Sequence, residues 1–142
     1  MPRYMIQVRA TSMSEAGEFP DDPTLVPRMM AFHDEMAQAG VLLDGAGLQP
    51  SSQGFRVHYD AAGTPAVVDG PFAETKELVA GYTLIEVRDR DEALAWARRF
   101  PAPFPGMACC IEVRPLMGGI DLPPEDAERL IREELAAIRQ HG

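Results

Sequence analysis

The sequence has few of the residues that build disulfide frameworks and metal sites. Its only two cysteines, Cys109 and Cys110, are neighbours, and its three histidines are scattered. Adjacent side chains of a strand point to opposite faces, so this pair cannot join distant parts of the chain. No C-x-x-C or H-x-x-x-H spacing supports a metal site. We therefore expect a reducing compartment and no metal or other cofactor.

Long apolar runs, a phosphate-binding loop and an excess of positive charge are also missing. No signal-peptide core and no run of membrane-spanning length interrupts the sequence. Gly45-Ala46-Gly47 is only a fragment of a glycine-rich loop. The 13 Lys plus Arg against 22 Asp plus Glu give a net charge of −9, which would repel a phosphate backbone. These absences favour a cytoplasmic protein that binds neither nucleic acid nor membrane.

What is present fits one compact domain built from strands and helices. The chain has 142 residues, of which 46% are hydrophobic, and strands and helices follow from apolar periods of 2 and 3.6. In chain order, the expected elements are strand 4–9, surface loop and lid 10–23, helix 24–40, short strand 41–43, hairpin 55–59 and 66–68, strand 79–87, helix 89–100, strand 108–114 and helix 124–140. Gly45, Gly47 and Pro50 should end the short strand.

The order of these elements predicts a ferredoxin-like α+β fold. Two β-α-β units with an inserted β-hairpin match the split βαβ arrangement, in which the first strand lies between the strands 79–87 and 108–114. We expect residues 1–117 to form this domain. Residues 118–142, after a hinge at Gly118-Gly119, should form a C-terminal helical extension that packs on the same domain.

A stiff turn at Asp69-Gly70-Pro71 precedes the best strand. Asp69 and Gly70 tolerate positive φ, and Pro71 fixes the next φ near −65°. As a turn residue, Asp69 is expected to accept hydrogen bonds from the following amides, with ligand binding as the alternative. Of the charged residues after the turn, Glu77 is expected to face inward.

The residues around this turn carry a family resemblance. The ungapped block Val68–Glu77, together with Gly81-Tyr82 and Ile111–Leu116, resembles the DGPF-domain branch of the YCII-related proteins. The likeness covers roughly the first four fifths of the chain and includes Gly45–Pro50. It implies a ferredoxin-like fold that pairs into a dimeric α+β barrel, in a family with no settled activity. The wider family is thought to use a histidine of the first helix with an aspartate, but that position corresponds to Met29 here and is not carried over.

Strand alternation places polar side chains together on one face of the sheet. The face covered by helices should receive Ile6, Val8, Ile85, Val87, Ile111 and Val113. The opposite, mixed face should receive Gln7, Arg9, Tyr82, Glu86, Cys110, Glu112 and Arg114. Two carboxylates in a partly dry cleft raise the pKa of one of them, which suits a general acid. The alternative is a set of solvated ion pairs near the strand ends.

From this face we select candidate site residues. The candidate catalytic residues are Glu112, Glu86 and Tyr82, and the candidate ligand-binding residues are Gln7, Arg9, Arg114, Asp69 and Glu77. His33, on the flank of the helix 24–40, is interpreted as a surface or satisfied core residue rather than a base. His58 is interpreted as an exposed strand residue and His141 as part of the C-terminus.

Two functions remain open at this stage, and the sequence does not decide whether the protein is an enzyme. One is a cofactor-independent acid/base enzyme, of lyase or isomerase type, acting on a small polar or aromatic metabolite. The other is a non-catalytic ligand-sensing or regulatory module, because the DGPF relatives often look linked to alternative sigma factors. In both, a homodimer formed through the mixed faces would hold a small-molecule ligand.

Overall fold

The computed structural model of the chain describes residues 1–117 and 124–141, so the expected hinge at Gly118-Gly119 lies outside the described residues. An antiparallel sheet of four strands has the order β2-β5-β1-β6. Its strands are β1 (Arg3–Arg9), β2 (Leu42–Gly47), β5 (Val79–Glu86) and β6 (Ile111–Pro115). The strand β1 lies between β5 and β6, as predicted, and the ferredoxin-like α+β fold is confirmed.

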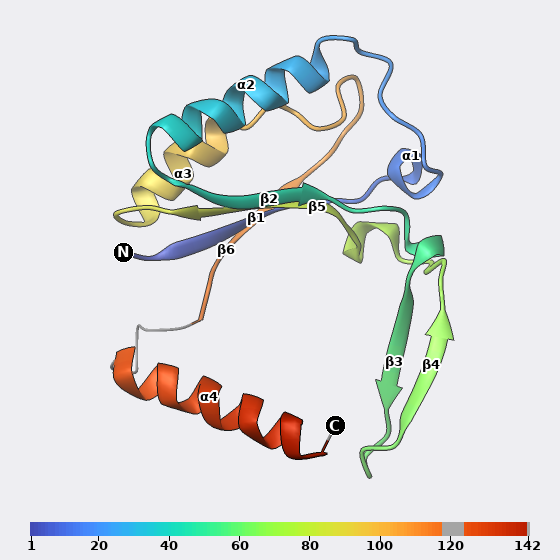
Figure 1. Cartoon of the computed structure of the whole chain (residues 1–142). Coiled ribbons are helices and arrows are strands. Elements are labelled where there is room, and N and C mark those ends of the chain that lie inside the picture. The colour runs from blue at the N-terminus through green and yellow to red at the C-terminus, as the bar shows by residue number, and fades with distance from the viewer. Residues whose placement is uncertain (118–123, 142) are drawn as a thin grey trace.

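Two helices cover one face of this sheet, namely α2 (Leu25–Gln38) and α3 (Arg90–Arg99) (Figure 1). The helix α2 ends where Gly40 adopts a φ of 77°, a conformation that glycine reaches without steric cost. The helix α3 begins at Asp89, whose carboxylate accepts a hydrogen bond from the amide of Glu92. The Glu92 side chain accepts from the amide of Arg88, one residue earlier than a full capping box requires.

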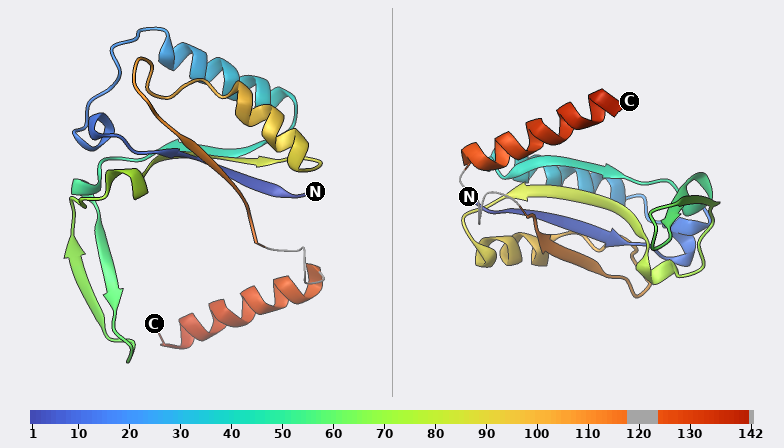
Figure 2. Two further views of the ribbon diagram at one scale, coloured as in Figure 1. Left: turned by 180° about the vertical axis from the view of Figure 1, so that it is seen from behind. Right: turned by 90° about the horizontal axis from the view of Figure 1, so that it is seen from below.

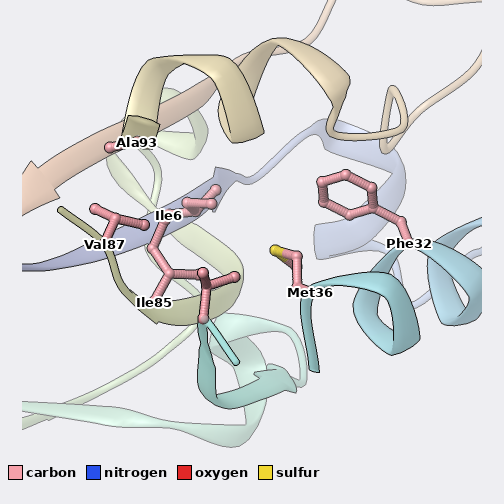
Figure 3. Close-up of a cluster of buried hydrophobic side chains, with 7 residues drawn as sticks. Ile6, Phe32, Met36, Ile85, Val87 and Ala93 are labelled. Atoms are coloured by element: carbon pink, nitrogen blue, oxygen red, sulfur yellow. The ribbon is translucent and has the colours of Figure 1, made fainter. Parts of the chain in front are cut away.

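The core lies between these helices and the sheet. Ile6 of β1, Ile85 of β5, Val87 just after β5 and Met36 of α2 are completely buried (Figure 3). Burying such side chains contributes roughly 1.5–3 kcal/mol each. The alternation of the sequence therefore predicted the covered face correctly, because Ile6, Ile85 and Val87 point to the helices.

Several boundaries differ from those expected. The strand β2 continues through Gly45 to Gly47, because its backbone pairs with β5 regardless of side chains. The strand β6 begins only at Ile111, so Cys109 and Cys110 precede it and are exposed. Within the expected loop 10–23, a single turn of helix, α1 (Ser12–Glu15), is capped by Thr11.

The other face of the sheet is not covered by α2 or α3. The hairpin of β3 (Phe55–Tyr59) and β4 (Pro65–Asp69) and the helix α4 (Pro124–His141) extend from the molecule on this open side (Figures 1 and 2). The apolar residues of α4 are 44–66% exposed, namely Leu130, Ile131, Leu135 and Ile138. The packing of this extension on the domain and the formation of a homodimer both stay predictions.

Candidate functional site

A cavity of about 630 Å³ lies between α2 and one end of the sheet. The helix α2 contributes Leu25, Met29 and His33, and the segment that follows α3 contributes Phe100 and Phe104. The loop 17–20 lies at the same cavity. Pockets that hold small molecules have this size and this mostly apolar lining.

Glycines on the sheet leave the space for this cavity. Gly47 of β2 pairs with Gly81 of β5, and both line the cavity together with Gly45. A Cβ atom added at Gly47 would meet no atom within 4 Å, whereas one at Gly81 would lie 3.1 Å from a backbone oxygen of β2. Gly45 and Gly47, expected from the sequence only to end the short strand, therefore form with Gly81 a part of the sheet that carries no side chains toward the cavity.

A histidine and a threonine form the polar pair of this cavity. His33 Nε2 lies 2.8 Å from Thr83 Oγ1, and His33 Nδ1 lies 2.8 Å from the carbonyl oxygen of Met29. A carbonyl oxygen can only accept, so we assign the ring proton to Nδ1, and Nε2 of the neutral ring accepts the Thr83 hydroxyl proton. Thr83 is 2% exposed, and among the residues that the structure describes it is the one polar residue classed as buried. Its hydroxyl therefore needs this partner.

Only some of the candidate residues of the mixed face lie near one another. Gln7 of β1 is directly opposite Tyr82 of β5 and Glu112 of β6, so these three side chains share one row of the sheet. Arg9 donates to the Gln7 side-chain oxygen at 3.3 Å and to the carbonyl oxygen of Lys76 at 3.0 and 3.2 Å. This arginine thereby ties the sheet to the segment before β5.

Glu86 and Arg114 do not join that row. Glu86 is opposite Arg3, four residues along β1 from Gln7, which is a separation of roughly 13 Å. Arg114 is opposite Met5 and is exposed. Glu86 shares the face of Gln7 and Glu112 but does not lie beside them, because strand parity fixes the face of a residue but not its register. The assignment of Glu86 and Arg114 to a functional site stays a prediction.

Tyr82 contacts a carboxylate that the sequence analysis did not select. Its hydroxyl donates to Asp44 Oδ2 of the edge strand β2 at 3.3 Å. The negative charge of Asp44 and this hydrogen bond raise the pKa of Tyr82 above its usual value of 10.0. The phenol is therefore a hydrogen-bond donor at neutral pH rather than a base.

The turn around Gly70 is a structural junction. Gly70 is not at positive φ, which corrects the expectation, and instead an added Cβ would lie 1.8 Å from the carbonyl oxygen of Ser51. The Ser51 hydroxyl accepts from the amide of Phe72 at 3.0 Å and donates to the carboxylate of Glu15. Glycine is required here because two backbone segments touch.

The side chains of Asp69 and Glu77 take no part in the hydrogen bonds of this junction. Among residues 1–117 and 124–141, no hydrogen bond involves the Asp69 carboxylate, so the expected bonds to the next amides are not formed. Glu77 is exposed, which corrects the expectation that it faces inward. Neither residue lines the cavity between α2 and the sheet.

From the sequence, His33 receives no part in a site, although one signal points to it. His33 follows Met29 by four residues, so the two lie on the same face of a helix one turn apart. Met29 belongs to the apolar stripe that faces the sheet, and both residues line the cavity. The position that corresponds to the wider family's histidine, Met29, therefore lies on the same face of α2 as His33, one turn away.

Within residues 1–117 and 124–141, no group of three or more His, Cys, Asp or Glu side chains is placed to hold a metal ion. None of the helices in the same part of the chain combines the length and the apolar character needed to cross a membrane.

The geometry defines a ferredoxin-like α+β protein with a cavity between its first long helix and its sheet. The profile of the YCII-related domain matches residues 3–117. The chain therefore belongs to the YCII-related domain family, which confirms the resemblance found in the sequence. An uncharacterised protein of Rhizobium meliloti (strain 1021) is 35% identical to it over 105 residues, covering 74% of this chain and 83% of that protein.

Proposed function

We propose that this protein binds a small, largely apolar or aromatic molecule in the cavity between α2 and the sheet. The observation that carries the proposal is the 630 Å³ space floored by Gly47 and Gly81, with the His33–Thr83 pair at its wall. Apolar walls with one placed polar group are typical of sites that bind and orient a small molecule.

Acid/base chemistry without a cofactor is the activity that this pair supports best. The Thr83 oxygen can accept a proton from a bound molecule while its own proton passes to His33 Nε2. The carbonyl oxygen of Met29 holds Nδ1–H in place, so the ring keeps the tautomer that this transfer requires. In the alternative function, a ligand-sensing module, the same cavity binds the molecule without converting it.

A cavity-filling substitution tests the binding site directly. Gly47→Val adds a side chain where the structure has no neighbouring atom within 4 Å, so the fold should be kept while the cavity shrinks. The probe is 2-phenylethanol, followed by chemical shifts of the backbone amides. We expect the parent to bind it with an affinity on the order of millimolar, about −4 kcal/mol. The Gly47→Val variant should bind it at least about tenfold more weakly.

The matched control for the cavity is Gly54→Ala, whose Cβ would make an ordinary contact at 3.6 Å from Ser51, in the loop before the hairpin. This variant should bind the probe like the parent. Equal binding by the parent and Gly47→Val, or the absence of any shift at the amides lining the cavity, would refute the proposal.

A second candidate site is the mixed face, because Gln7, Tyr82 and Glu112 share a row there. We compare Glu112→Gln with His33→Ala, using His58→Ala on the exposed strand β3 as the control for loss of an imidazole. If the cavity is the site, His33→Ala changes probe binding and the other two variants do not. Loss of binding in Glu112→Gln alone would move the site to the mixed face.

A further inference from the structure

We propose that the cavity selects organic cations, meaning amines with an apolar or aromatic body, over anions of the same shape. The inference deepens the proposed function and rests on it. The described residues that line the cavity include one formally charged side chain, the carboxylate of Glu18, and neither lysine nor arginine. An anionic group bound there would find no cation to neutralise it, and burying an unpaired charge is costly.

The carboxylate of Glu18 is available to a ligand. Within residues 1–117 and 124–141, it forms no salt bridge, and its residue is exposed in the loop between α1 and α2. The neighbouring α1 adds the carboxylate of Glu15, which binds Ser51 close to Pro50 of the cavity wall. The chain as a whole has a net charge of −9. Both the carboxylates near the cavity and the negative net charge of the protein therefore attract a cation.

Aromatic rings provide a second reason for the same preference. Phe19, Phe100 and Phe104 line the cavity, and Phe19 is 88% exposed, beside Glu18. The face of an aromatic ring carries partial negative charge, so rings around a site favour an ammonium group and disfavour a carboxylate. The apolar body of the ligand would be removed from water by the same rings.

The hydrogen-bonding groups of the wall point to a ligand that donates. Nδ1 of His33 already donates to the Met29 carbonyl oxygen, and the Thr83 hydroxyl donates to Nε2. What remains toward a ligand is a lone pair of the Thr83 oxygen, which can only accept. An ammonium group can donate to this oxygen, whereas a carboxylate cannot.

Three probes with one aromatic body test this selectivity, namely 2-phenylethylamine, 2-phenylethanol and 3-phenylpropionate. The full chain is titrated in low-salt buffer at about pH 8, where the amine and the carboxylate carry their charges. We expect the amine to bind about five- to tenfold tighter than the alcohol and the carboxylate to bind weakest. The preference for the amine should shrink as salt is added.

Two variants separate the local charge from the overall charge. Glu18→Gln should reduce amine binding about threefold and change alcohol binding by clearly less. Glu134→Gln, on the exposed surface of α4, changes the net charge by the same amount and should leave the preference intact. If the alcohol or the carboxylate binds at least as tightly as the amine, the selectivity is refuted while the proposed binding site stands. If none of the three probes binds, both are refuted.

Discussion

Replacing Gly70 by alanine should destabilise the fold by about 3–5 kcal/mol. The new Cβ would lie 1.8 Å from the Ser51 carbonyl oxygen, which is 1.2 Å inside the 3.0 Å limit that real Cβ contacts keep, and 2.7 Å from the carbonyl carbon. The two backbone segments must therefore separate. This movement breaks the bonds from Gly70 N to Gly54 O and from Phe72 N to Ser51 Oγ. Each bond contributes about 1 kcal/mol, and overpacking adds about 1–3 kcal/mol.

The assay is equilibrium unfolding in urea together with thermal melting, and Gly54→Ala is the control. An alanine Cβ at Gly54 lies 3.6 Å from the same Ser51 oxygen, at ordinary van der Waals distance, so both variants remove one glycine beside one carbonyl group. We expect Gly70→Ala to melt roughly 10–17 °C below the parent, and Gly54→Ala to melt within a few degrees of it. Equal stability of the two variants would show that the backbone contact at Gly70 does not control the fold.

Three further outcomes are expected. Asp69→Ala combined with Pro71→Ala should cost about 1–3 kcal/mol of stability and leave binding in the cavity unchanged; a variant that melts like the parent but no longer binds would make Asp69 functional. Light scattering should give a dimer mass at micromolar concentration, with an interface above roughly 1,000 Å²; a monomer mass would contradict this. Spectrophotometric titration should show the phenol of Tyr82 ionising above the usual pKa of 10.0, and Asp44→Asn should lower that pKa. Because the folded-state pKa is raised, the stabilising contribution of the phenol is complete below about pH 10 and is lost as the pH rises through the folded-state pKa; an unchanged titration in Asp44→Asn would refute this interaction.

Strand alternation predicts the face on which a candidate residue lies, but not its neighbours on that face. Alternation placed Gln7 and Glu112 on one face correctly, because the pleat of a strand fixes the side on which each residue lies. It could not place Glu86 relative to them, because register depends on hydrogen bonds between strands that are distant in sequence. The hydrogen bond of His33 with Thr83 likewise became visible only in the structure, since fifty residues separate the two.

The sequence by itself determined the ferredoxin-like α+β class and the apolar face of the sheet. These properties follow from local periodicity and from helix caps, which each depend on a few neighbouring positions. Only the tertiary structure decided that Gly70 serves a backbone contact with Ser51 and that Gly47 and Gly81 pair to leave a cavity. Glycine has no side chain, and whether it allows a turn, a close backbone contact or an open space depends on which distant segment lies against it.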